Sequence, residues 1–153
     1  MKYNGWILLA LALSVATLAA ADKPIKFSDL PSIVQKTMTN ETQATGAKIK
    51  NTLIEVEDGK TYYECESILA NGKTRDFLVD PQGKVYEVED EVEEGEIPAA
   101  VKAVVDKAAA GGGKITKLEA VKHDGKITGY EATVVKNGKK TGLELNPDGT
   151  KAK

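Results

Sequence analysis

Residues 58–85 read DGKTYYECESILANGKTRDFLVDPQGKV, and this stretch decides the fold. Three turn signals divide it: Asp58-Gly59, Asn71-Gly72 and Pro81-Gln82-Gly83. Asp-Gly and Asn-Gly supply the positive φ angles that two-residue hairpins need. The segments between these turns are therefore expected to be antiparallel strands of one meander.

The same pattern returns 66 or 67 residues later along the chain. Asp58-Gly59-Lys60 recurs as Asp124-Gly125-Lys126, and Leu30-Pro31 recurs as Ile97-Pro98 at the start of a second amphipathic segment. The predicted fold class is α+β, with two tandem α-β-β-β-β modules, each a helix packed on an antiparallel meander sheet. The modules are expected over residues 22–92 and 93–153, the last strand of the second being short or missing.

Successive side chains of a strand point to opposite faces of its sheet. Tyr63, Cys65 and Ser67 therefore share the buried face, where the single cysteine is expected to act as a small apolar core residue. The opposite face is expected to bind a protein partner. Its candidate residues in the two repeats are Tyr62, Glu64, Glu66, Glu131, Thr133 and Val135. Tyr62 is the best anchor candidate, because tyrosine is enriched among the residues that dominate interfaces, although it can also simply cover its neighbours.

Residues 1–21 have the layout of a secretory signal. Lys2 supplies the positive start, residues 7–20 form an uncharged, mostly apolar run, and Ala19 to Ala21 offer a cleavage site. That run is short for a bilayer-crossing helix, which needs roughly 20 apolar residues. We expect a mature chain that begins near Asp22 and is exported to the periplasm or the extracellular space without a stable membrane anchor. An uncleaved anchor is the alternative.

Charge and cysteine content exclude several classes of protein. The formal charge is −2 for the whole chain, and loss of Lys2 with the signal makes the mature chain slightly more acidic. A nucleic-acid-binding protein needs a basic face, so no nucleic-acid partner is expected. One cysteine cannot form an internal disulfide, so packing alone must hold this exported fold.

No catalytic residue, cofactor site or metal site is predicted. His123 is the only histidine, and it lies beside Asp124 at a predicted hairpin tip as a solvated turn residue. Zinc motifs such as HExxH and CxxC are absent from the sequence. The run from Gly111 to Lys114 follows a helix instead of preceding one, so it is a helix stop and not a phosphate loop.

An acidic run marks the join between the two repeats. It is interpreted as a solvated strand end and linker, because charge runs usually are. The alternative is a small-ligand or calcium-binding protein, since Asp90 and Gly95 have the spacing of an EF-hand loop. Val92 and Val101, however, stand where that loop requires carboxylate ligands. The run consists of Glu87, Glu89, Asp90, Glu91, Glu93, Glu94 and Glu96.

A family resemblance rests on the turn and core residues. Leu30-Pro31 at the helix start, Asp58-Gly59-Lys60 before Tyr62-Tyr63-Glu64, and FLVDPQGKV at 77–85 resemble the PepSY-like family. They resemble more closely the PepSY-like domains grouped with the beta-lactamase-inhibitor fold, over nearly all of residues 26–153. The resemblance implies helices on one face of an antiparallel sheet, and tandem copies that build a concave surface. It also implies exported proteins that bind or restrain other proteins, and it brings no catalytic residues.

The sequence therefore predicts an exported, non-enzymatic protein-binding module whose partner is another exported protein. The resemblance adds a finer hypothesis, that the module inhibits a secreted or periplasmic hydrolase.

Overall fold

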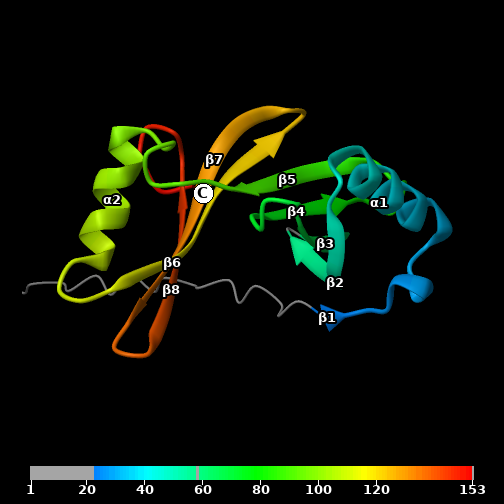
Figure 1. The fold of residues 1–153 in the computed structure, drawn as a ribbon, viewed down its shortest axis with the longest axis horizontal. Helices are drawn as coiled ribbons and strands as arrows, with labels where there is room; N and C mark the ends of the chain where they lie inside the picture. The colour runs from blue at the N-terminus through cyan, green and yellow to red at the C-terminus, as the bar shows by residue number, and fades with distance from the viewer. Residues whose placement is uncertain (1–22, 58, 153) are drawn as a thin grey trace, which may run out of the picture.

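The computed structural model describes residues 23–57 and 59–152, and the expected export signal lies outside them. Within this part the chain forms one antiparallel sheet in which the strands follow one another in chain order (Figure 1). The strands are β1 (Lys23–Pro24), β2 (Lys48–Glu57), β3 (Lys60–Ile68), β4 (Thr74–Val79), β5 (Val85–Glu91), β6 (Lys114–His123), β7 (Lys126–Lys136) and β8 (Lys139–Leu145). A short 3-10 helix (Phe27–Asp29) precedes α1 (Ser32–Thr45), and α2 (Ala99–Ala109) lies between β5 and β6.

The expected division into two helix-plus-four-strand modules is wrong, because the sheet is a single eight-stranded one. The last strand of the first repeat, β5, pairs with the first strand of the second, β6, from Val88↔Lys122 to Glu91↔Glu119. In two separate sheets these two strands would each present an unpaired edge, and pairing them removes both edges. The boundary predicted at residues 92 and 93 falls just after β5.

One end of the sheet differs from the expected repeats and the other agrees with them. β1 adds a two-residue strand to the edge of β2, which the repeat pattern did not indicate. After β8, the last strand of the second repeat, predicted to be short or missing, is only an isolated bridge between Leu145 and Lys151.

The hairpin turns form where the sequence places them. Asp124 and Gly125, between β6 and β7, have φ angles of 47° and 76°, as a two-residue turn with both central residues left-handed requires. Asn137 and Gly138 repeat this geometry between β7 and β8, with φ angles of 50° and 76°. These local signals therefore fix the strand boundaries.

Both helices pack on the same face of the sheet. The first core joins Val34 and Met38 of α1 to Cys65 and Phe77, and Phe77 pairs with Val88 on β5. The second core joins α2 to β6, β7 and β8, and its members are Ile97, Val101, Val105, Leu118, Ala120, Tyr130, Ala132 and Leu145. Side chains of directly paired residues point to the same face, and the register carries this face from β4 through β5 to β6.

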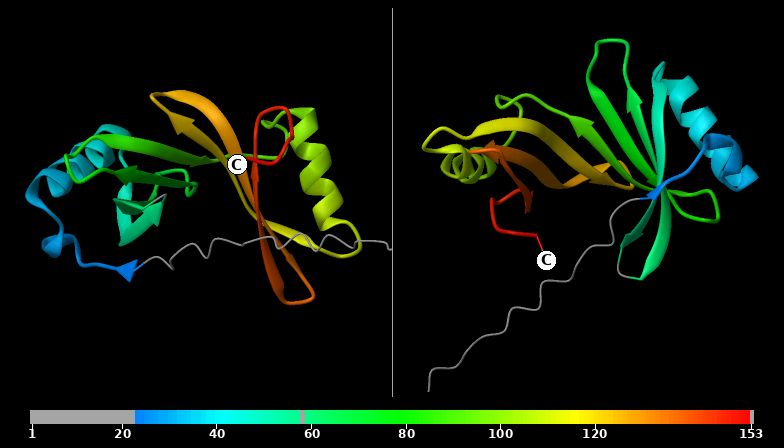
Figure 2. Two further views of the ribbon diagram at one scale, coloured as in Figure 1. Left: turned by 180° about the vertical axis from the view of Figure 1, so that it is seen from behind. Right: turned by 90° about the horizontal axis from the view of Figure 1, so that it is seen from below.

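The expected core position of Cys65 is confirmed, since its side chain is 0% exposed. The helices lie at the two ends of the strongly twisted sheet (Figure 2). α1 contacts β3 and β4, whereas α2 contacts β6 and β7. In the described part of the chain no helix packs on the opposite face, which we call the open face.

Candidate functional site

The open face carries carboxyl groups on every strand from β3 to β8. Strand alternation and register place these side chains together, because directly paired residues point to the same side. Glu64 and Glu66 come from β3, Asp76 from β4, Glu87, Glu89 and Glu91 from β5, Glu119 from β6, Glu131 from β7 and Glu144 from β8.

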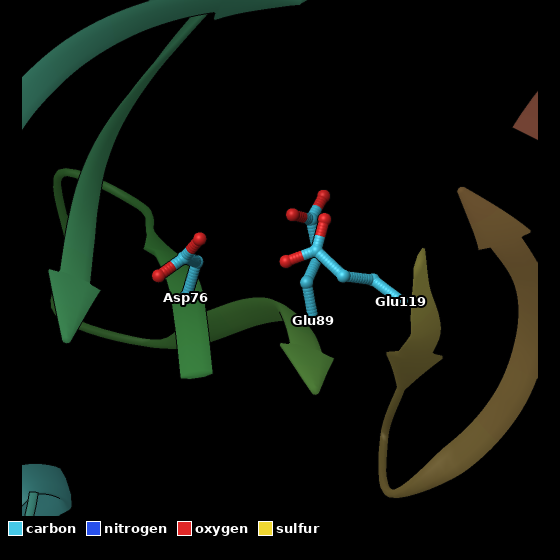
Figure 3. A group of neighbouring side chains, drawn as sticks. All are labelled: Asp76, Glu89 and Glu119. Carbon is cyan, nitrogen blue, oxygen red and sulfur yellow. The ribbon is translucent and has the colours of Figure 1, made fainter. Parts of the chain in front are cut away.

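Three of these carboxyls converge at the centre of the face. Asp76, Glu89 and Glu119 each have a carboxyl oxygen within 4.8 Å of the other two, and Figure 3 shows them approaching one another from three neighbouring strands. Asp76 pairs directly with Glu89, and Glu119 pairs with Glu91 two residues along the same strand. Asp76 is 3% and Glu119 1% exposed. We call these three residues the carboxylate cluster.

Lys117 is the basic side chain that contacts the carboxylate cluster. Its Nζ lies 3.0 Å from Asp76 Oδ2 and 2.9 Å from Glu119 Oε1. The second oxygen of Asp76 accepts a hydrogen bond of 3.2 Å from the backbone N–H of Ser67. A single ammonium group thus holds two carboxylates together, and the third carboxyl, that of Glu89, stands beside them.

Burial and mutual repulsion change the acidity of this face. Burial, with the charges of Glu131 and Glu119, raises the pKa of Glu89 to about 9. Burial and the charge of Glu144 raise the pKa of Glu131 to about 7. The pKa of Glu119 is also raised, by burial, although Lys117 opposes this. Part of the face is therefore protonated at neutral pH, as expected when like charges gather in a partly desolvated site.

For Lys117, burial would lower the pKa, but hydrogen bonding and charge from Glu119 and Asp76 raise it above its ordinary value. The lysine therefore stays charged wherever the protein is folded in ordinary buffers.

An aromatic group borders the acidic centre. The rings of Tyr62 and Tyr86 stack with centroids 4.5 Å apart, and Tyr86 meets the ring of His123 edge-on at 4.9 Å. His123 Nε2 lies 2.9 Å from Glu87 Oε2, and its Nδ1 is 3.0 Å from the Tyr86 carbonyl oxygen. His123 is thus the last residue of β6 and packs on its neighbours, whereas a solvated turn position was expected.

The structure places all six predicted binding residues on the open face. Glu64, Glu66, Glu131, Thr133 and Val135 are half-buried, and Asn51 donates a hydrogen bond to Glu66. Tyr62 is only 5% exposed because it stacks on Tyr86, so little of its ring is accessible to a partner. The binding role of these residues stays a prediction.

Sequence reasoning missed the carboxylate cluster and Lys117. A signal was present, since Glu87, Glu89 and Glu91 recur at every second position, as residues on one face of a strand do. That spacing alone fits a solvated strand end equally well. Asp76 and Glu119 stand far from it in the sequence, and only the strand register brings them together.

The acidic join does not form the calcium loop that was the alternative interpretation. Asp90 points to the helix side, where it pairs with Arg75 at 2.6 Å and Lys122 at 2.7 Å. Beyond β5, Glu93 and Glu96 pair with Lys73, and Glu94 pairs with Lys102. Among residues 23–57 and 59–152, the three-carboxyl group that could hold a metal ion is the carboxylate cluster on the sheet. Asp90, Glu93, Glu94 and Glu96 of the join are thus paired with basic side chains.

Within the described residues, no helix is both long enough and apolar enough to span a bilayer.

No protein-family model matches the chain. No curated protein matches it either. Solved structures do match. A candidate periplasmic protein from Bacteroides eggerthii has a TM-score of 0.59 at 17% identity, over 81% of this chain and 86% of that one.

Two further solved structures match the chain in fold. A DUF2874 family protein from Bacteroides ovatus has a TM-score of 0.54 at 17% identity, over 81% of this chain and 85% of that one. A BLIP-like protein from Bacteroides fragilis has a TM-score of 0.50 at 16% identity, over 81% and 84%. The expected likeness in fold to the beta-lactamase-inhibitor group is confirmed, whereas the PepSY-like identification is not. At this identity the comparisons show that the chain shares the fold of DUF2874 family and BLIP-like proteins.

Proposed function

We propose that the chain is an exported, non-enzymatic binding module that holds another exported protein on its open face. One observation carries the proposal: a whole face of an eight-stranded sheet is left without a covering helix in the described residues, and it bears carboxyl groups on six consecutive strands. Buried charge is costly unless it is paired. If these carboxyl groups had only a structural role, they would lower the stability of the fold with nothing to offset that loss.

The contacts of His123 support a non-enzymatic role. Catalysis needs a base oriented toward a nucleophile or a bound substrate. In the described part of the chain the ring nitrogens of His123 face the carboxylate of Glu87 and the carbonyl oxygen of Tyr86. The thiol of Cys65 is in the first core on the other side of the sheet, and burial raises its pKa to about 12, which disfavours the nucleophilic thiolate.

Export is supported by the signal-like residues 1–21. The finer proposal is that the partner is a secreted or periplasmic hydrolase and that binding inhibits it. A curved sheet face can cover a convex surface of a partner, and the likeness in fold to a BLIP-like protein is in keeping with that reading.

Partner capture tests the proposal. The chain without residues 1–21 is used as bait on an exported fraction, together with two variants that each replace two carboxyl groups by amides. Glu64→Gln with Glu131→Gln alters the open face, whereas Glu93→Gln with Glu94→Gln alters the exposed join. We expect the face variant to lose a protein that wild type and the join variant retain. That protein is then purified and assayed for hydrolase activity with and without the chain. Equal retention by both variants would place binding elsewhere.

A further inference from the structure

The imbalance of charge on the open face is the starting point. In the described part of the chain Lys117 is the basic side chain that forms ion pairs with the carboxylate cluster. The other lysines that register places on this face in β6 and β8, Lys114 and Lys140, pair with Val135 at its far end. Arg75 and Lys122 lie on the helix side with Asp90. At the carboxylate cluster, acidic side chains therefore outnumber basic ones.

We infer that the segment a partner lays on the open face is basic, and that one of its lysine or arginine side chains enters between the carboxylate cluster and Glu131 while protons leave the face. This inference rests on the proposed function, and it names the chemistry of the partner and the condition that controls binding.

Lys117 shows how the cluster receives a cation. Its ammonium group makes close contacts to two carboxylates at once, at 3.0 and 2.9 Å, and charge-assisted contacts of this kind are the strong ones. The charge of Glu131 helps to raise the pKa of Glu89, and a cation bound beside both groups favours their ionised forms. A guanidinium group suits the position best, because its planar fork can bond two carboxylates together.

Proton release follows from the groups that surround Glu89. The charged groups that face it are Asp76 on β4, Glu87 and Glu91 on its own strand, Lys117 and Glu119 on β6, and Glu131 on β7. Acids outnumber the base, and Glu89 and Glu131 have raised pKa values of about 9 and about 7. A bound cation favours the ionised forms, so each carboxyl that ionises passes its proton to the solvent.

Because binding is coupled to proton release, the sign of the pH dependence of the affinity is fixed. Binding that releases protons strengthens as the pH rises, by up to about tenfold in Kd per pH unit for each proton released. Because Glu131 and Glu89 titrate in succession, we expect the affinity for a basic segment to rise from about pH 6 to pH 9. Simple screening of surface charges would give salt dependence without this proton release.

A defined probe tests the inference. The probe is a capped peptide of alternating glycine and arginine, and its matched control carries neutral citrulline in place of arginine. Calorimetry at pH 7.5 in two buffers of different ionisation enthalpy measures both Kd and the protons released. We expect the arginine peptide to bind with proton release, about tenfold or more tighter at pH 8.5 than at pH 6, and the citrulline peptide to bind at least tenfold more weakly.

Paired variants locate the binding. Glu89→Gln with Glu119→Gln removes two carboxyls from the cluster, and Glu93→Gln with Glu94→Gln removes two from the exposed join. We expect the first to lose at least tenfold in affinity and most of the proton release, and the second to match wild type. Carboxyl chemical shifts of the wild-type chain with and without peptide provide the same test without substitution, since Glu89 and Glu131 should ionise on binding.

Equal binding of the citrulline peptide, unchanged binding by the cluster variant, or binding without proton release would overturn the inference.

A further experiment uses calcium chloride in place of the peptide. Displacement of the arginine peptide by calcium alone at micromolar concentration would assign the cluster to a metal instead. If a captured protein depends on the open face but the arginine peptide does not bind, the inference fails while the proposed function stands.

Discussion

Glu89 stands on a central strand of the sheet, with carboxyl groups on the strands to either side. Its pKa of about 9 means that the folded chain holds a proton there that the unfolded chain, with an ordinary pKa of 4.5, releases at neutral pH. Holding that proton costs stability, because the folded state must bind it from a solution in which it is scarce.

We therefore predict that Glu89→Gln stabilises the protein at pH 7.5. Glutamine keeps the shape of the protonated acid without requiring the proton, and the gain should be on the order of 2 kcal/mol. At pH 4, where both states are protonated, the gain should vanish. Thermal or urea unfolding at the two pH values measures this. Glu94→Gln, an exposed residue paired with Lys102, should change stability by less than about 0.5 kcal/mol at either pH. A destabilised Glu89→Gln at pH 7.5 would contradict the account.

Cys65 provides a second test at the residue scale. It is 0% exposed, and burial, followed by the charge of Asp76, raises the pKa of its thiol to about 12. We predict very slow reaction with thiol reagents in the folded state and rapid reaction in denaturant, measured by absorbance. Cys65→Ala should cost only about 1 kcal/mol, since the second repeat already has Ala132 at the matching position. Fast labelling of the folded chain would show that the first core opens readily.

The junction between β5 and β6 holds the two repeats in one sheet. The backbone register between these strands comprises four residue pairs. On the helix side, Asp90 of β5 bonds both Arg75 of β4 and Lys122 of β6, at 2.6 and 2.7 Å. Although burial opposes it, these hydrogen bonds lower the pKa of Asp90 below its ordinary value. The triad therefore crosses three strands at the junction.

We predict that Asp90→Asn destabilises the folded chain by about 2 kcal/mol at pH 7, because two half-buried cations lose their common partner. The matched control is Asp124→Asn, which removes a carboxylate from the exposed pair with Lys84, and it should change stability by less than about 0.5 kcal/mol. Urea unfolding followed by circular dichroism measures both. An unchanged midpoint for Asp90→Asn would mean that backbone pairing alone holds the junction.

The elements show what the sequence can and cannot predict. Hairpins such as Asp124-Gly125 were predictable because left-handed backbone is a local requirement that glycine and its neighbour satisfy. The β5–β6 pairing was not, because α2 and its loops separate these strands and no local residue specifies which edge each strand meets. The face on which Glu64 and Glu131 lie was likewise predictable, because strand alternation is local. The proximity of Asp76, Glu89 and Glu119 was not predictable, because it depends on which strands pair.

The whole molecule should respond to pH through opposing groups. Three carboxyls, those of Glu89, Glu131 and Glu119, have raised pKa values in the folded chain. Their effect on the free energy of unfolding is most favourable below the unfolded pKa of 4.5, and it is lost as the pH rises through about 7 and about 9. Asp90 has a lowered pKa, so its contribution is lost in acid below its ordinary pKa of 3.8. The sum places the stability maximum on the acidic side of neutrality.

We predict a melting temperature that peaks near pH 5 and falls by on the order of 5 °C toward pH 9. Calorimetric scans across this range at constant ionic strength measure the profile. The double variant Glu89→Gln with Glu131→Gln should flatten the decline without changing the acid side. A profile that rises from pH 5 to pH 9 would show that these carboxyls are ionised in the folded chain.

Because strand order follows chain order, β1 and β8 are the two opposite edges of the sheet. A force that pulls these two strands apart acts along the inter-strand hydrogen bonds, which run perpendicular to the strands. Such a force breaks these hydrogen bonds a few at a time, and it does not load all the bonds of a strand pair together in shear. The chain is therefore expected to be mechanically weak when stretched from its edges. A partner seated across β3 to β8 would clamp the sheet, and bound chain should unravel at a higher force than free chain.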